Sequence, residues 1–194
     1  EDIAIMRVIP NMRVILPADS VAVSKLTWTI AQQYGPFYMR MCRSKTPIIH
    51  NNSQEFQIGK AITMRDGSDC TIAACGITVK MALDAADLLN QDGISCRVVD
   101  CFSIKPIDKE LLEKAARETG AIVTCEEHNV MGGFGSAVSE VISESYPVPI
   151  RRIGVQDKFG ESARDNEILQ LLEKHGLTPI NITNMVKEAR SQKQ

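Results

Sequence analysis

Residues 70–101 read CTIAACGITVKMALDAADLLNQDGISCRVVDC, and this stretch gives the clearest indication of the fold. Its first five residues, Cys70–Ala74, form a short apolar run that is typical of a buried strand. Gly76 interrupts this run, and the hydroxyl of Thr78 can cap a following helix. The apolar residues of that helix recur at helical spacing: Met81, Ala82, Ala85, Leu88 and Leu89. The stretch therefore begins with a strand and continues into an amphipathic helix.

Gly93 occupies the position that often follows a helix C-terminus, and residues 97–100, Arg-Val-Val-Asp, are the next predicted strand. A strand, a helix and a second strand in this order predict a parallel βαβ unit. The alternation continues downstream, with strands expected at 121–125 and 150–155 and helices at 106–117, 132–144, 164–175 and 179–190. Such alternation predicts an α/β fold with a doubly wound, mostly parallel sheet.

The N-terminal part of the chain shows a shorter pattern of the same kind. Residues 13–16 and 37–42 are apolar runs that we expect to be buried strands. Asp19 or Ser20 can cap a helix between them, which Gly-Pro ends before the second strand. Residues 3–9 are expected to finish another helix. This part therefore contains about one βαβ unit, a fragment of a parallel sheet.

Residues 44–60 interrupt both patterns with Pro, Asn, Ser and Gln, as an extended connection between domains does. We therefore divide the chain into a first segment (1–43), a linker (44–60) and a second domain with a core of its own (61–194). Within the second domain, another strand is expected at 61–64, before a turn at 65–68. The first segment exposes a sheet edge that needs a neighbour, so we expect it to be the less stable part.

Composition and charge limit the classes of partner. With 24% charged residues and a net charge of −2, the chain lacks the basic surface of a nucleic-acid-binding protein. No apolar run reaches the roughly 18–20 residues that a membrane-spanning helix needs, so we expect no membrane partner. The chain opens with EDIAIMRVIP, without the apolar region of a signal peptide and without an initiator Met. We take it to start inside a longer protein.

The cysteines and histidines indicate a reducing compartment and no metal site. Six cysteines are present, namely Cys42, Cys70, Cys75, Cys96, Cys101 and Cys125. None forms a Cys-x-x-Cys pair, and with only three histidines a zinc site is not expected. We therefore predict free, mostly buried thiols in a cytoplasmic protein. His50 in the linker and His175 at a helix end are expected to be solvated or capping groups.

Several segments together resemble transketolases, in the order in which that family has them, and they cover essentially the whole chain. They are EDIAIMRVIPNMRVILPAD (1–19), YMRMCR (38–43), IIHNNSQEFQIGKA (48–61), VVDCFSIKPID (98–108), CEEHNVMGGFGSAV (125–138) and KFGESARDNEILQLLEKHGLT (158–178). The first two are similar to the end of the pyrimidine-binding domain. The third looks like the linker of the animal-type branch, and the last three resemble the transketolase C-terminal domain.

The resemblance implies the C-terminal section of an enzyme that moves a two-carbon ketol unit between sugar phosphates of the pentose phosphate pathway. It implies thiamine diphosphate and Mg²⁺ in the full enzyme, a homodimer, and an N-terminal section on the same or a separate chain. The family's Gly-Asp-Gly…Asn motif for the metal-bound diphosphate is absent here, and its activating glutamate lies before Glu1. We therefore expect no catalytic, cofactor-binding or metal-binding residue, and no binding of thiamine diphosphate by this chain alone.

Two alternatives stay open at this point. The same layout occurs in 1-deoxyxylulose-5-phosphate synthase and in the β chains of 2-oxoacid dehydrogenases, although the linker and the Cys-Arg-Ser at 42–44 favour transketolase. The other alternative is a non-catalytic oligomerisation or regulatory module that kept the fold. If this chain is mixed with an N-terminal transketolase section, recovered ketol transfer would identify it as an enzyme subunit and not as a non-catalytic module.

One site residue follows from the resemblance. Arg43 falls where transketolases place an arginine against the substrate phosphate. A planar guanidinium can hold a phosphate with two parallel hydrogen bonds, and α/β sheets bind ligands at the carboxyl ends of strands. An interdomain ion pair at the start of the linker is the alternative role. Arg40 is expected on the opposite face of the same strand, in a structural role.

Two neighbouring groups of residues could bind an anion or transfer protons, but we expect structural roles for both. The Gly-Gly-Phe-Gly-Ser turn at 132–136 follows a strand and opens a helix, so its N–H groups could bind an anion. Tight strand-to-helix packing or contact with a partner chain explains its glycines better. Glu126, Glu127 and His128 precede this turn and could form an acid–base group. The resemblance implies interface and loop residues instead.

Overall fold

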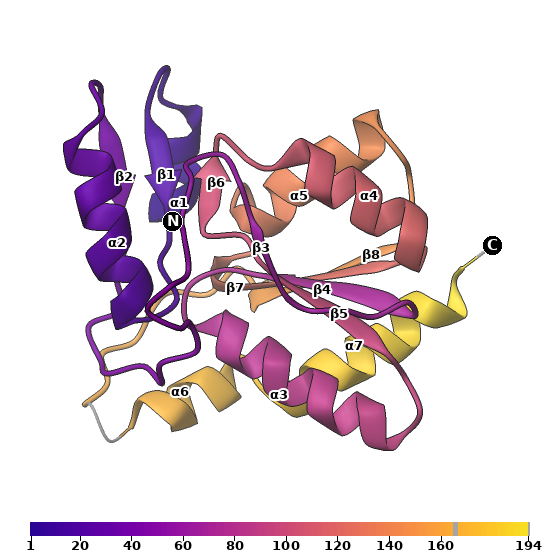
Figure 1. Cartoon of the computed structure of the whole chain (residues 1–194). Coiled ribbons are helices and arrows are strands. Elements are labelled where there is room, and N and C mark those ends of the chain that lie inside the picture. Colours follow the sequence, from indigo (N-terminus) through magenta and orange to yellow (C-terminus); the bar gives the residue numbers. More distant parts are fainter. Residues whose placement is uncertain (165–166, 194) are drawn as a thin grey trace.

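The computed structural model describes residues 1–164 and 167–193, which form two sheets with helices packed around them (Figure 1). The larger sheet has five strands in the order β3-β5-β4-β7-β8. The smaller sheet has three strands in the order β2-β1-β6. The predicted α/β fold with mostly parallel strands is therefore confirmed.

The larger sheet consists of β3 (Ile62–Arg65), β4 (Cys70–Ala74), β5 (Cys96–Asp100), β7 (Ile122–Asn129) and β8 (Ile150–Val155). All neighbouring pairs are parallel except β3 and β5, which are antiparallel. The turn at 65–68 thus joins two strands that do not pair, since β5 lies between them. Gly67 makes this crossing possible, because a Cβ there would lie 2.2 Å from the backbone carbon of Cys96.

Helices cover both faces of the larger sheet, as the doubly wound prediction requires (Figure 1). One face packs against α3 (Thr78–Gln91), α6 (Ile168–Lys174) and α7 (Pro179–Ser191), and the other against α4 (Lys109–Thr119) and α5 (Phe134–Glu144). The helix expected at 164–175 is described from Ile168 onward, and residues 165–166 lie outside the described residues. β4 is buried on both faces, which explains why its sequence is continuously apolar.

The start of α4 differs from the prediction, which placed it at Pro106. The helix begins at Lys109, because the Asp108 side chain caps it by accepting a hydrogen bond from the Leu111 N–H at 3.1 Å. The preceding residues, Ser103–Lys105, form the short strand β6 instead. Only the first part of the expected helix is therefore wrong.

The N-terminal part contains α1 (Asp2–Val8), β1 (Arg13–Ile15), α2 (Ser20–Ala31) and β2 (Phe37–Met39). β1 and β2 are parallel, which confirms the predicted βαβ unit, and Asp19 caps α2. β2 ends at Met39 and not at Cys42. On its other side β1 pairs antiparallel with β6, so a strand from residues 103–105 completes the smaller sheet.

The first segment also shares a core with the rest of the chain. Ile3, Val14 and Leu16 belong to the same buried apolar cluster as residues of β4, β5, α4 and α5. Lys105 adds polar links, since its Nζ donates to the carbonyl oxygens of Arg7 and Ile9 at 2.7 Å each. The division into 1–43, 44–60 and 61–194 stays a prediction about how the chain unfolds.

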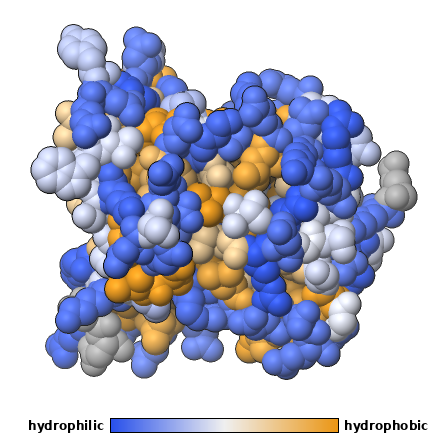
Figure 2. Space-filling view, in the orientation of Figure 1, coloured by the Kyte–Doolittle hydropathy of each residue, from blue (hydrophilic) through white to orange (hydrophobic). Residues whose placement is uncertain are grey.

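The surface in Figure 2 is mostly hydrophilic, with hydrophobic side chains gathered between the lobe that contains α2 and the larger sheet. Some large apolar side chains are well exposed, among them Trp28 on α2 and Val8 on α1, at 71% and 79% of their full area. None of the helices within the described residues is both long and apolar enough to span a membrane.

Candidate functional site

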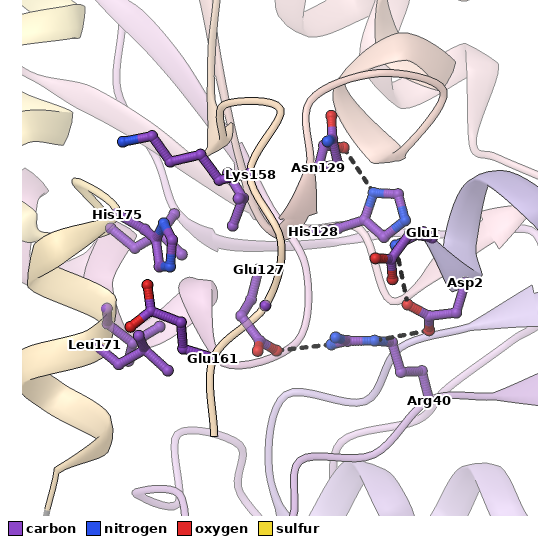
Figure 3. Close-up of a pocket in the computed structure, with 14 residues that line it drawn as sticks. Glu1, Asp2, Arg40, Glu127, His128, Asn129, Lys158, Glu161, Leu171 and His175 are labelled. Atoms are coloured by element: carbon purple, nitrogen blue, oxygen red, sulfur yellow. Dashed lines mark hydrogen bonds and ion pairs between the residues drawn. The ribbon is translucent and has the colours of Figure 1, made fainter. Parts of the chain in front are cut away.

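A polar cavity of about 200 Å³ lies where the ends of β2 and β7 meet the start of α1 (Figure 3). Arg40, directly after β2, is held at its wall. Its Nε donates to Asp2 Oδ2 at 2.9 Å, and its Nη1 donates to Glu127 Oε2 at 2.7 Å. Burial alone would lower the pKa of Arg40, but the carboxylates of Glu127 and Asp2 outweigh burial and raise it. The guanidinium therefore stays charged and joins α1, β2 and β7.

A second cavity, of about 480 Å³, adjoins the first and shares Asp2, Arg40 and Glu127 with it. Arg43 lines this cavity from an exposed position, and its Nη2 donates to the carbonyl oxygen of Ala163 at 3.1 Å. Arg40 and Arg43 thus face a common cavity, and the prediction that Arg40 points to the opposite face is wrong. The prediction was wrong because β2 ends at Met39, so the alternation of side chains along a strand does not extend to these arginines.

The glycine turn before α5 is occupied by the chain's own carboxylate. Glu126 is fully buried, and its two oxygens accept the N–H groups of Phe134 at 2.6 Å and Gly135 at 2.8 Å. A Cβ on Gly133 would lie 2.1 Å from Glu126 Oε2, and one on Gly135 would lie 2.6 Å from Thr124 Oγ1. Tight strand-to-helix packing therefore explains these glycines, and the helix N-terminus is already occupied by the carboxyl group of Glu126.

Glu126, Glu127 and His128 make different hydrogen bonds, although His128 Nδ1 also lies 3.7 Å from Glu126 Oε2. Burial raises the pKa of Glu126 to about 7, although the Gly135 and Phe134 N–H groups oppose this effect. Glu127 pairs with Arg40, as above. His128 Nδ1 lies 2.7 Å from the carbonyl oxygen of Asn129, and its Nε2 accepts the Ala4 N–H at 3.5 Å. Burial lowers the pKa of His128, which favours the neutral ring.

His50 is not the solvated or capping group that we predicted. It is 5% exposed, and its ring stands between two buried carboxylates, Asp19 and Asp100. Nδ1 is 3.2 Å from Asp19 Oδ2, and Nε2 is 3.3 Å from Asp100 Oδ2. The sequence showed Asp19 as a helix cap and Asp100 as a strand end, but no pattern linked either to the linker. His175 follows the prediction, since it is the C-cap of α6.

The side chains of this chain do not fit a metal-bound diphosphate. Within residues 1–164 and 167–193, no three His, Cys, Asp or Glu side chains are grouped so that they could hold a metal ion. The N-terminus of α5 is filled by Glu126, whose carboxyl group already accepts the N–H groups that a diphosphate would need. All six cysteines are free thiols, and five of them are buried.

Comparisons with known proteins give a consistent result. Residues 59–182 match the family described as "Transketolase, C-terminal domain". The chain is 44% identical to the "Putative transketolase C-terminal section" of Methanocaldococcus jannaschii, covering 97% of this chain and 58% of that protein. It is 39% identical to the 1-deoxy-D-xylulose-5-phosphate synthase of Heliobacterium modesticaldum, covering 96% of this chain but 29% of that enzyme.

A solved structure described as "Split gene transketolase, inactive beta4 tetramer" matches with a TM-score of 0.94 and 46% identity. The match covers 100% of this chain and 62% of that chain. The chain therefore spans about three fifths of the length of the transketolase relatives it matches.

Proposed function

This chain belongs to the family of transketolase C-terminal domains, and on that premise we propose that it is the C-terminal section of a transketolase. The reaction proposed is the reversible transfer of a two-carbon ketol unit between sugar phosphates of the pentose phosphate pathway. Two relatives support a two-chain enzyme with a separate N-terminal section, since one is described as a C-terminal section and another as a split-gene transketolase.

Within such an enzyme, this chain contributes assembly and substrate binding and leaves the cofactor to the N-terminal section. Thiamine diphosphate, when bound there with Mg²⁺, supplies the electron sink for the two-carbon unit. The present residues support this division, because Glu126 fills the helix N-terminus that could have received a diphosphate. Docking of the two sections would fall to the cavity side of α1, β2 and β7, where Arg40 joins these elements.

The observation that supports a role in substrate binding is the position of Arg43. Arg43 lies in the loop four residues after β2 ends, exposed at the cavity of about 480 Å³. A phosphate entering that cavity would replace the Ala163 carbonyl oxygen, to which Arg43 Nη2 donates, and would then accept two parallel N–H bonds from the planar fork. The carboxyl end of a parallel strand is also where α/β sheets bind ligands. We therefore assign Arg43 to the phosphate of the sugar substrate.

Arg43→Ala tests this assignment in the chain assembled with its N-terminal section. A charge-assisted phosphate contact contributes roughly 1.5–3 kcal/mol, so the KM for xylulose 5-phosphate should rise about 10- to 100-fold. The KM for an unphosphorylated ketol donor should change little. Lys45→Ala is the matched control, because it removes an exposed cation from the same loop. Equal losses on both donors would show that Arg43 supports the structure instead of the substrate.

The enzyme branch is tested with the same assembled protein. Activity with xylulose 5-phosphate and ribose 5-phosphate supports a transketolase. Activity with pyruvate and glyceraldehyde 3-phosphate instead supports the 1-deoxyxylulose-5-phosphate synthase alternative, to which the 39% identical relative belongs. Neither activity, in a complex that demonstrably forms, supports a non-catalytic module. The proposal also includes a homodimer, and a cytoplasmic location because all six thiols are free.

A further inference from the structure

The ring of His50 lies between two carboxylates that are both inaccessible to solvent. The side chains of Asp19 and Asp100 are 0% exposed, and that of His50 is 1% exposed. Each ring nitrogen faces a carboxylate oxygen, at 3.2 Å and 3.3 Å. The Nδ1 contact is a hydrogen bond, whereas the Nε2 contact has an ion-pair distance without hydrogen-bond geometry, so a positive charge on the ring is what compensates Asp100. Phe56 packs edge-on against it, with the ring centroids 5.1 Å apart.

Three segments meet at this ring. Asp19 caps α2 through the Ala22 N–H at 2.8 Å, and its Oδ2 also accepts the backbone N–H groups of Ile49 and His50, at 2.8 Å each. Asp100 is the last residue of β5 in the larger sheet. The backbone of the linker is therefore bound to the cap of α2, and the ring contacts both this cap and the end of β5.

The fastened point closes the loop that contains Arg43. At one end of the loop, the N–H of Arg40 donates to the Ile15 carbonyl oxygen at 2.9 Å, and its side chain pairs with carboxylates. At the other end, Ile49 and His50 are bound to Asp19. Arg43 lies in the span of 41–48 between these two anchors. The place of its guanidinium relative to the cavity therefore depends on both.

We propose that protonated His50 is a positioning residue, which fixes the linker end of the 41–48 loop and so holds Arg43 at its cavity. The importance of Arg43 rests on the proposed function, whereas the anchoring of the loop does not. Without the imidazolium, two buried carboxylates would face each other without a compensating charge. One of them would take up a proton or move toward water, and the linker would lose its attachment to β5.

The anchor should weaken as the pH rises. Burial would lower the pKa of His50, but Asp100 and Asp19 raise it above its ordinary 6.5. The stabilisation from the charged ring is therefore fully present below pH 6.5 and is lost as the pH rises through the elevated pKa. Burial raises the pKa of Asp100 from 3.8 to about 6, so its ionisation costs stability above about pH 6, and this cost disappears at lower pH. The nearby thiols of Cys75 and Cys101 stay neutral, because burial raises the pKa of each well above 9.0.

Limited trypsin digestion of the 194-residue chain measures the anchor directly, because Arg43 and Lys45 are cleavage sites within the loop. His50→Gln should speed cleavage after these two residues by about 10-fold, since proteolysis follows the population of the open loop. In the wild-type chain, the same cleavage, measured relative to a peptide substrate, should accelerate as the pH rises through the elevated pKa of His50, and in His50→Gln it should not.

Thr119→Val is the control for general destabilisation. It removes a buried hydroxyl that bonds Thr71 at 2.9 Å, at the start of β4 and far along the sheet from Asp100. It should leave cleavage after Arg43 and Lys45 unchanged. Equal acceleration in both variants, or none in His50→Gln, would overturn the proposal. Asp100→Asn in the His50→Gln background should recover stability by relieving the uncompensated carboxylates, and a further loss would also contradict it.

One measurement on the wild-type chain keeps the outcome clear if His50→Gln does not fold, and a second applies if the variant does fold. The ¹⁵N signals of His50 in the wild-type chain at pH 6.5 should show two protonated ring nitrogens, and a neutral ring would overturn the proposal. In the assembled enzyme, His50→Gln should raise the KM for a phosphorylated donor about 10-fold and leave kcat unchanged. In the Arg43→Ala background, His50→Gln should not raise the KM for the phosphorylated donor any further. If Arg43→Ala leaves the KM for phosphorylated donors unchanged while trypsin cleavage behaves as expected, the proposed phosphate contact is refuted and the anchoring of the loop is not.

Discussion

Gly133→Ala should destabilise the chain strongly, although it adds one methyl group. Gly133 is the N-cap of α5, with φ −78°, so alanine is not excluded by backbone conformation. The obstacle is space: the new Cβ would lie 2.1 Å from Glu126 Oε2 and 2.6 Å from His128 Nδ1. Real Cβ contacts are never this short, so the carboxylate must leave its place or α5 must shift.

The cost follows from the bonds that Glu126 makes. Its carboxylate accepts the N–H groups of Phe134 and Gly135, at 2.6 Å and 2.8 Å, inside the core. Each hydrogen bond to a charged group contributes roughly 1.5–3 kcal/mol, so losing both costs about 3–6 kcal/mol. Since domains are usually stable by about 5–15 kcal/mol, the variant should fold but only marginally.

Urea unfolding followed by circular dichroism measures this change. With a slope of roughly 2 kcal/mol per molar urea, the midpoint should fall by about 1.5–3 M. Gly160→Ala is the matched control, since a Cβ there meets no atom within 4 Å. It should change the free energy of unfolding by less than about 0.5 kcal/mol, which is about 0.25 M in the midpoint. Glu126→Ala should cost a similar amount, and adding Gly133→Ala to it should cost little more. A Gly133→Ala midpoint equal to that of Gly160→Ala would refute this reasoning.

Two further predictions concern the whole chain. Calorimetry with thiamine diphosphate and Mg²⁺ should show no binding to this chain alone, because Glu126 fills the N-terminus of α5. Micromolar binding at one site per chain would contradict the proposal that the N-terminal section binds the cofactor. Hydrogen exchange should be slow in β4, β5 and β7 and faster through much of 1–58. The reason is that β2 is an edge strand with no fully buried residue. Equally slow exchange of 1–43 in a dilute monomeric sample would refute the predicted domain boundary.

The parts of the fold that were predicted correctly depend on local sequence. β4 and α3 follow from an apolar run and a helical repeat within Cys70–Gln91, and the cap of α2 follows from Asp19. β6 was missed, because a strand of three residues is defined by its partner β1 and not by a pattern of its own. The start of α4 was placed at Pro106 and not at Lys109, because the cap at Asp108 was not recognised.

The candidate site was predicted less completely than the fold. Arg43 came from the resemblance to a family, and its position at a cavity agrees with that role without testing it. The network around Arg40 was missed, because its carboxylates lie 38 and 87 positions away in the sequence. The burial of His50 was missed as well, since a polar linker gives no sign that two distant aspartates enclose its ring.

The sequence by itself determined the α/β class, the order of nearly all strands and helices, and the family. These properties follow from residue spacing and short motifs, which are set within a few turns of chain. Only the tertiary structure decided that Glu126 fills the N-terminus of α5, that Arg40 joins α1 to β7, and that His50 lies between Asp19 and Asp100. The physical reason is that a buried charge needs partners from whichever segments the fold brings beside it, however far apart they lie along the chain.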